Sequence, residues 1–211
     1  MPVFERVSFD PDFLSYEAGY ELQYGVHSEV VSKKRPDTVL LLEHQSVYTA
    51  GKRTEPNELP DDGTPFIETN RGGKITWHGP GQLVGYPIMH LPQPIDVVNY
   101  VRYLEQVIID VIAHYGVSGI RVSGRTGVWV ETADGTKKVA AIGIRVSEKV
   151  TMHGFALNCN NSLEPYEHII ACGISDAATT SLKELTGQDI SPAQAATLVE
   201  QIMGEIPNAR A

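Results

Sequence analysis

Residues 126–159 read TGVWVETADGTKKVAAIGIRVSEKVTMHGFALNC, and this stretch decides the fold. It contains three apolar or alternating runs, at Gly127–Glu131, Lys138–Val146 and Val150–Cys159. The first two runs flank Asp134-Gly135, a pair that favours the tight turn of a β-hairpin. A second tight connection at Ser147-Glu148 leads into the third run. The stretch therefore predicts three consecutive antiparallel strands.

Helical patterns lie on both sides of these strands. Near the N-terminus, apolar residues recur every four positions and predict an amphipathic helix over roughly residues 12–32. The clearest helix is expected at Val97–Tyr115, with Gly116 placed to end it. Towards the C-terminus, Ser191 can cap a helix that runs to about Met203. The apolar run Thr38–Glu43 predicts a buried strand between the first two helices.

This order of elements predicts an α+β fold, with helices packed on one side of a mixed β-sheet. The chain has 211 residues, of which 42% are hydrophobic and 20% charged, as in globular proteins. No composition shift or linker divides it, so residues 1–211 are expected to form a single domain.

The charge and cysteine content bound the class of function. A formal net charge of −9 disfavours nucleic acid or anionic membranes as partners. The N-terminus has no basic leader followed by an apolar run, and no stretch of about twenty apolar residues occurs. We therefore expect a cytoplasmic protein whose two cysteines, Cys159 and Cys172, stay reduced.

The most unusual segment is Arg71–Gln82, which reads RGGKITWHGPGQ. Paired glycines let a backbone approach a ligand closely. Alternation in a short strand would direct Thr76 and His78 to one face and Trp77 to the other. The spacing matches neither a Walker phosphate loop nor a dinucleotide fingerprint. A binding loop with a histidine is the functional interpretation, and an ordinary surface loop is the alternative.

Cys172 is the candidate nucleophile, although a cysteine among small and apolar residues is more often a buried hydrophobe. A catalytic thiol needs a neighbour that takes its proton, and the candidates are Lys138, His78 and His153. Lys138 begins an apolar strand, where it would be either partly desolvated or a solvated edge residue. The histidines and cysteines lack the spacing of a zinc site, so no metal is expected.

Five motifs in order identify a resemblance. The first is Arg71-Gly72-Gly73-x-x-Thr76-x-His78-Gly79-Pro80-Gly81-Gln82-Leu83-Val84, followed by Tyr86-Pro87. The other four are Gly124–Trp129, Lys138–Gly143, His153–Asn158 and Ala171–Ile174. Over roughly residues 16–187 the chain resembles the octanoyltransferases of lipoate biosynthesis. Trp77 stands where that family commonly has tyrosine, a change that we interpret as a mild variation in the pocket wall.

The resemblance implies a fold shared with lipoate and biotin protein ligases, and a catalytic dyad of Cys172 and Lys138. Octanoyl would pass from octanoyl-acyl carrier protein to Cys172 as a thioester and then to a lysine of a lipoyl domain. The implied acceptors are lipoyl domains of 2-oxoacid dehydrogenases and the glycine cleavage H protein. No cofactor is implied, and a monomer is expected. The implied acyl-binding residues are Arg71, Gly72, Gly73, Lys74, Ile75, Thr76, Trp77, His78, Ala141, Ile142, Gly143, Gly154, Phe155 and Ala156.

Other functions stay open from the sequence. A related enzyme that moves octanoyl between lipoyl proteins would also use a cysteine and differs in its donor, and a thioesterase would use water as the acceptor. An ATP-dependent lipoate ligase on the same fold would form an acyl-adenylate, and a non-catalytic acyl-binding protein would form no thioester. Backbone N–H groups near Gly72-Gly73 or around Cys172 are the expected oxyanion donors. A local basic rim is expected to attract acidic carriers despite the negative net charge. Its members would be Lys52, Arg53, Arg71, Lys74, Arg125 and Arg145.

Overall fold

The computed structural model describes residues 1–61, 63–170 and 178–205. Two β-sheets carry the fold. The main sheet has the order β1-β2-β6-β10-β9-β8-β7, and a small sheet has the order β4-β3-β5. The main-sheet strands are β1 (Val3–Ser8), β2 (Thr38–Leu42), β6 (Gln82–Ile88), β7 (Ile120–Val122), β8 (Arg125–Thr132), β9 (Gly135–Ser147) and β10 (Val150–Asn158). The small sheet contains β3 (Val47–Ala50), β4 (Phe66–Glu68) and β5 (Thr76–His78).

The described helices are α1 (Tyr16–Val31), α2 (Val97–Ala113), α3 (Leu182–Thr186) and α4 (Pro192–Glu205), with short 3₁₀ turns at Pro56–Glu58 and Glu164–His168. Three of the four described helices, α1, α2 and α4, begin and end close to the predicted positions, whereas α3 was not predicted. Helix α1 starts four residues later than expected, because the Ser15 side chain accepts a hydrogen bond from the Ala18 N–H and caps it. In α4, the Gln194 N–H donates to Ser191 Oγ and the Ser191 N–H to Gln194 Oε1, which is the predicted capping box.

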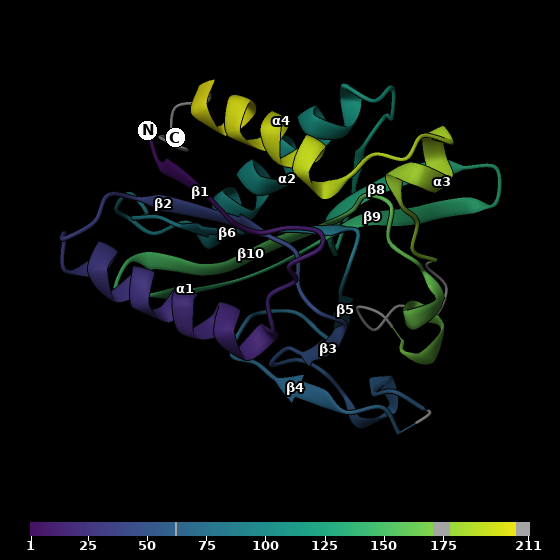
Figure 1. The fold of residues 1–211 in the computed structure, drawn as a ribbon, viewed down its shortest axis with the longest axis horizontal. Coiled ribbons are helices and arrows are strands. Elements are labelled where there is room, and N and C mark those ends of the chain that lie inside the picture. Colours follow the sequence, from purple (N-terminus) through teal and green to yellow (C-terminus); the bar gives the residue numbers. More distant parts are fainter. Residues whose placement is uncertain (62, 171–177, 206–211) are drawn as a thin grey trace.

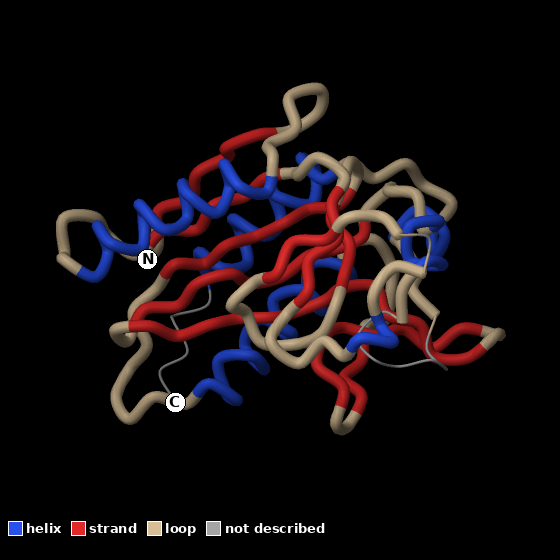
Figure 2. The backbone as a smooth tube through the Cα atoms, turned by 90° about the horizontal axis from the view of Figure 1, so that it is seen from below, coloured by secondary structure: helices blue, strands red, loops and turns tan. Residues whose placement is uncertain are grey.

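The prediction that helices cover one side of the sheet is wrong. Helix α1 lies on one face, and α2 and α4 lie on the other (Figure 1). Along β2, Leu41 packs with the α2 and α4 cluster, whereas Leu40 and Leu42 pack with α1. Successive side chains of a strand point to opposite faces, so a wholly apolar strand such as β2 needs both faces covered. Figure 2 shows α1 running across its face of the sheet.

The mixed sheet itself is as predicted, and it contains the three consecutive antiparallel strands β8, β9 and β10. Among the described strands of this sheet, β1 and β2 form the one parallel pair. Strand β1 was not predicted, because it is a half-exposed edge strand that carries Glu5 and Arg6 and lacks clean alternation.

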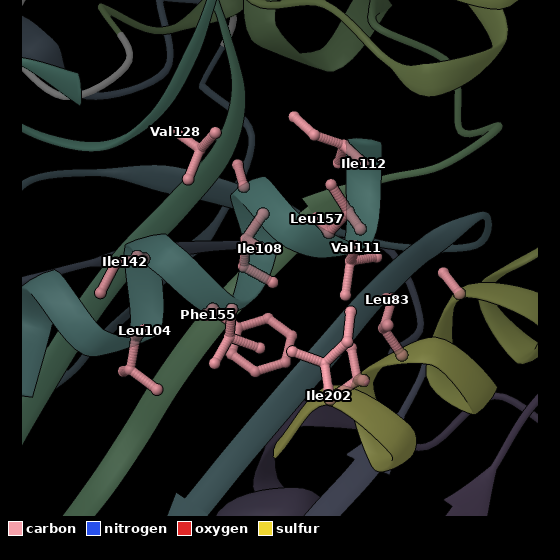
Figure 3. Packing of buried hydrophobic residues seen from close by; sticks show 14 of the residues in the cluster. Leu83, Leu104, Ile108, Val111, Ile112, Val128, Ile142, Phe155, Leu157 and Ile202 are labelled. Atoms are coloured by element: carbon pink, nitrogen blue, oxygen red, sulfur yellow. The ribbon is translucent and has the colours of Figure 1, made fainter. Parts of the chain in front are cut away.

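The larger core lies between the sheet and helices α2 and α4. Leu104, Ile108 and Ile112 of α2 are fully buried there against Leu157 of β10 (Figure 3). Among the described residues, no helix is both long enough and apolar enough to cross a membrane.

Candidate active site

A cavity lies on the α1 side of the main sheet, beneath the glycine-rich loop. The sheet supplies Val84 and Tyr86 from β6, Ala141–Gly143 from β9 and His153–Ala156 from β10. The loop and β5 supply Arg71, Gly73, Lys74, Thr76 and His78, and α1 supplies Tyr16. Segments that are separated by more than a hundred residues in sequence therefore line one space.

Most of the implied acyl-binding residues meet at this cavity, but three do not line it. Gly72 faces the sheet backbone, while Ile75 and Trp77 pack with Tyr48 and Ile169 in a separate cluster. The Trp77 indole N–H donates to Ser46 Oγ at 2.9 Å. Trp77 is therefore not in the pocket wall, because the alternation of β5 directs it away from Thr76 and His78, as the pattern predicted.

Two glycines let the loop lie directly on the sheet. The Gly72 N–H donates to the Ile144 carbonyl at 2.9 Å. A Cβ on Gly143 would stand 2.8 Å from the Gly72 carbonyl oxygen, so only glycine permits this approach. Because the Gly72 N–H is already engaged, it is not an available oxyanion donor, which corrects one of the expected sources.

Arg71 holds the loop together from inside. Its side chain is buried, and its guanidinium donates to the carbonyls of Gly72 and Lys74 at 3.1 and 2.8 Å. It also donates to the Thr49 carbonyl at 2.7 Å and to Thr49 Oγ1 at 2.9 Å. These bonds tie the loop to β3. Arg71 is consequently an internal brace and not part of an exposed basic rim.

Lys74 is also engaged, since its ammonium pairs with Glu58 and, at 3.4 Å, with Glu55. The side chain of Glu58 is only 4% exposed. The ion pair joins the loop to the 3₁₀ turn Pro56–Glu58, so Lys74 fixes the loop's outer edge. Of the expected rim, Lys52 and Arg53 are exposed, whereas Arg125 and Arg145 are partly buried.

Two histidines of the cavity wall, His78 and His153, and the neighbouring His44 are in their neutral form. Burial lowers the pKa of His44 to about 4, and it lowers those of His78 and His153 to about 3. His78 Nδ1 lies 2.8 Å from Gln82 Oε1. The Gln82 Nε2 donates to Asn158 Oδ1 at 2.8 Å, which fixes the amide orientation. His78 therefore donates through Nδ1, and its Nε2 carries a lone pair.

The tyrosines at the cavity are uncharged as well. Burial raises the pKa of Tyr16 to about 12 and raises that of Tyr86 well above its ordinary value. The Tyr86 hydroxyl donates to His44 Nε2 at 2.7 Å, and the His44 Nδ1–H donates to the Leu14 carbonyl at 3.0 Å. With neutral imidazoles and phenols beside Val84, Ala156 and the strand glycines, most of the wall suits an apolar chain.

The cavity also includes residues that the sequence did not single out for it. Tyr16, Val84, Tyr86 and His153 line it. Val84, Tyr86 and His153 lie in the motifs that carry the resemblance, but none of the four was among the implied acyl-binding residues. The alternation of β6 places Val84 and Tyr86 on the α1 face. A prediction with helices on both faces of the sheet would therefore have placed these two residues on the same side as the cavity. Ile142 and Phe155, which were expected to line an acyl tunnel, border the cavity and also pack in the α2 core (Figure 3).

We predict an acid-sensitive fold from the three neutral histidines. Their folded pKa values lie below the ordinary 6.5, so below that pH the unfolded chain binds protons that the folded chain does not. Stability is then full above pH 6.5 and falls towards pH 4, by about 1 kcal/mol per pH unit for each histidine. Urea unfolding between pH 7 and 5 measures the slope.

The control for this pH dependence is a histidine outside the cluster. His78→Gln should reduce the slope by about one histidine's share, whereas His114→Gln, at an exposed position, should leave it unchanged. Equal slopes in all three proteins would contradict the assignment.

Lys138 is buried inside β9, with 7% of its surface exposed. It is not at the strand end, because β9 begins at Gly135. Its Nζ lies 4.5 Å from the centroid of the Trp129 ring. Its backbone N–H donates to the Ala178 carbonyl at 2.9 Å and its carbonyl accepts from the Thr180 N–H at 2.9 Å. The segment that follows Cys172 in sequence is thus attached to Lys138.

The two cysteines differ in what the structure says of them. Cys172 lies outside the described residues. Cys159 is fully buried, and burial raises the pKa of its thiol to about 12. Cys159 is therefore the inert core residue that the sequence suggested.

The described residues contain no group of three or more His, Cys, Asp or Glu side chains that could hold a metal ion. His44 and His78 are near neighbours, with ring centroids 6.1 Å apart. Both nitrogens of His44 and Nδ1 of His78 are engaged in hydrogen bonds within the protein.

Comparisons with known proteins agree on one family. A model of the lipoyl protein ligase A/B catalytic domain matches residues 15–204. An octanoyltransferase from Leifsonia xyli subsp. xyli is 54% identical over 202 residues, which cover 94% of this chain and 90% of the relative. An octanoyltransferase from Salinispora tropica is 58% identical over 190 residues, which cover 89% of each protein.

Solved structures share the fold at much lower identity. A bi-partite lipoate protein ligase from Thermoplasma acidophilum has a TM-score of 0.72 at 11% identity, with 97% of this chain and 82% of that chain covered. The biotin protein ligase of Aquifex aeolicus has a TM-score of 0.56 at 11% identity, with 97% and 70% covered. The fold expected from the motifs, that of lipoate and biotin protein ligases, is confirmed.

Proposed function

Because the chain belongs to the octanoyltransferases of the lipoyl protein ligase A/B catalytic-domain family, we propose that Cys172 carries the octanoyl group as a thioester and that Lys138 moves the protons. The enzyme is an acyltransferase that transfers octanoyl for protein lipoylation, from an acyl donor to a lipoyl-domain acceptor. The finer proposal is that octanoyl-acyl carrier protein is the donor. The acceptors would be lipoyl domains of 2-oxoacid dehydrogenases and the glycine cleavage H protein.

The observation that supports the proposed dyad is that Lys138 is buried and is hydrogen-bonded to Ala178 and Thr180, which follow Cys172 closely in sequence. Cys172 precedes Ala178 by six residues, and Ala178 is hydrogen-bonded to the Lys138 backbone. Six residues span at most about 20 Å, and this short separation in sequence supports the pairing of Cys172 with the lysine. A buried amine has little water to exchange protons with and is suited to take them from a thiol nearby.

The reaction then follows in two acyl transfers. Lys138 takes the Cys172 proton, and the thiolate attacks the carbonyl carbon of the donor thioester. The bond to the carrier sulfur breaks, and the carrier thiol leaves with the proton from Lys138. In the second transfer an acceptor lysine attacks octanoyl-Cys172, Lys138 accepts a proton from that amine, and the Cys172 thiolate leaves. The donor is already activated, so no ATP is consumed.

The cavity is proposed to hold the octanoyl chain. It borders Ala141–Gly143, which begin three residues along β9 from Lys138. We place the carbonyl end of the bound chain at the side of the cavity nearer to the amine. The uncharged histidines and tyrosines let the chain enter without desolvating an ion. Arg71, whose donors serve the loop, would shape the cavity without binding the carbonyl itself.

An ATP-dependent lipoate ligase is not favoured. The octanoyltransferase relatives are 50–58% identical to this chain, whereas the lipoate protein ligase of Thermoplasma acidophilum is 11% identical and shows the fold alone.

Intact-protein mass spectrometry tests the thioester. Mixing the enzyme with octanoyl-acyl carrier protein, without ATP or acceptor, should add one octanoyl mass that a lipoyl domain then removes. Cys172→Ala should abolish the adduct, and Cys159→Ala should keep it, because the Cys159 thiol is buried and protonated. An adduct that survives Cys172→Ala would overturn the assignment of the nucleophile.

A further inference from the structure

The pairing register of β8 and β9 determines the face of the sheet to which the Lys138 side chain points. Val128 pairs with Ala140 and Trp129 pairs with Lys138, so one step along β8 matches two steps along β9. The additional residue, Val139, makes a β-bulge, a feature that re-aims side chains. Val139 and Ala140 accordingly lie in the same core cluster although they are adjacent in sequence. Without the bulge, Lys138 would share the face of Ala140 and enter the α2 core.

The bulge instead sets Lys138 against an aromatic ring. Trp129 is its cross-strand partner and is only 1% exposed. The Lys138 ammonium lies over the indole at 4.5 Å from its centroid, well inside the range of a cation–π contact. The Arg125 guanidinium also lies over this ring, at 5.8 Å. The indole N–H donates to the Arg125 carbonyl at 3.3 Å, which fixes the plane of the ring.

A buried carboxylate on α2, that of Glu105, binds the β8 backbone next to Trp129 and Lys138. Glu105 is fully buried and accepts from Arg102 and Arg121 at 2.6 and 3.1 Å. Its Oε1 also accepts from the Gly127 N–H at 3.1 Å. Gly127 has φ +116°, and a Cβ there would stand 2.5 Å from the Ala140 carbonyl oxygen and 3.4 Å from Lys138 Cε. The hydrogen bond from Gly127 to Glu105 therefore fixes β8 at a point where the backbone passes close to the Lys138 side chain.

We propose that Trp129 is the positioning residue of Lys138: the indole face holds the ammonium at one point on β9 and stabilises its charged form while leaving its N–H bonds for the reacting groups. This inference rests on the proposed function, because it assigns a task to the lysine of the dyad. An aromatic face attracts a cation through its quadrupole without accepting a conventional hydrogen bond. A carboxylate in its place would occupy the donors and repel a thiolate.

The indole would act in both acyl transfers. Each of them forms a Lys138 ammonium, first with the proton of Cys172 and then with a proton of the acceptor amine. The ring stabilises that ammonium each time, so losing the ring slows proton transfer and leaves binding of the octanoyl chain unchanged. Trp129 does not line the cavity.

Kinetics separate this role from a structural one. Trp129→Leu should lower the turnover number about 10-fold with little change in the KM for octanoyl-acyl carrier protein, and Trp129→Tyr, which keeps a ring, should recover most of the rate. Both variants shrink a buried side chain, so their unfolding midpoints are measured alongside. Rates that follow the midpoints, with no advantage for tyrosine, would overturn the proposal. In a Lys138→Met background, Trp129→Leu should cost no further rate.

Fluorescence tests the contact independently of catalysis. The chain has two tryptophans, so Trp77→Tyr leaves Trp129 as the single emitter. In that protein Lys138→Met should change the emission intensity, and Lys137→Met should not. Unchanged emission in both would overturn the inference. If the emission responds but Lys138→Met leaves turnover intact, the proposed dyad has failed and the contact has not.

Discussion

Replacement of Lys138 by methionine should lower the turnover number for octanoyl transfer by about 10²–10⁴-fold, the range of a lost general acid–base group. Methionine is unbranched and apolar and can fill the space beside Trp129, so the fold should persist. Steady-state transfer to a lipoyl domain measures the effect, and the unfolding midpoint verifies the fold.

The neighbouring lysine provides the matched control. Lys137 lies on the same strand, is more exposed and pairs with Asp134 at 3.8 Å. Because exposed ion pairs contribute little, Lys137→Met should stay within about 2-fold of the unmodified enzyme. If Lys138→Met were equally active, Lys138 would not belong to the dyad.

Replacement of Arg71 by methionine should destabilise the protein by about 3–5 kcal/mol, through the loss of a hydrogen-bonded buried cation and the exposure of unpaired carbonyls. The carbonyls of Gly72, Lys74 and Thr49 would lose their donor. The loop would then leave the sheet, and the KM for the octanoyl donor should rise. Denaturant unfolding and donor titration measure the two effects.

Arg71→Lys distinguishes geometry from charge. Lysine keeps the positive charge but cannot reach Thr49 and Lys74 at once, because it lacks the planar fork of arginine. If Arg71 braces the loop, Arg71→Lys should retain little of the stability, whereas Arg53→Met, at an exposed position, should be neutral. Full rescue by lysine would show that only charge matters.

Local sequence patterns predicted the individual elements well. The segment Gly79-Pro80-Gly81-Gln82 forms the expected turn, with the Gln82 N–H donating to the Gly79 carbonyl at 3.1 Å and φ +84° at Gly81. Proline at the second position and glycine at the third suit a type II turn, whose geometry depends on four residues alone. Helix α2 likewise follows from its apolar spacing and from its Asp96 cap, which accepts from the Asn99 N–H at 2.8 Å.

The arrangement of those elements was predicted less well. The sequence indicated helices on one side of the sheet, although the unbroken apolar run of β2 already required cover on both faces. Lys138 was expected at a strand end, yet β9 extends three residues beyond it because the hairpin closes at Thr132 and Gly135.

By itself, the sequence determined the mixed sheet, its hairpins, the main helices and the set of motifs that give the family, because turns, caps and apolar periods act over a few residues. Only the tertiary structure decided what those motifs face. A bulge opposite Val128 re-aims Lys138 onto Trp129, and Arg71 turns inward to Thr49. His44, His78 and Tyr86 meet from three different strands or strand ends, and burial keeps all three uncharged. Register and burial are properties of contacts between distant segments, and these contacts are fixed only when both faces of the sheet are packed.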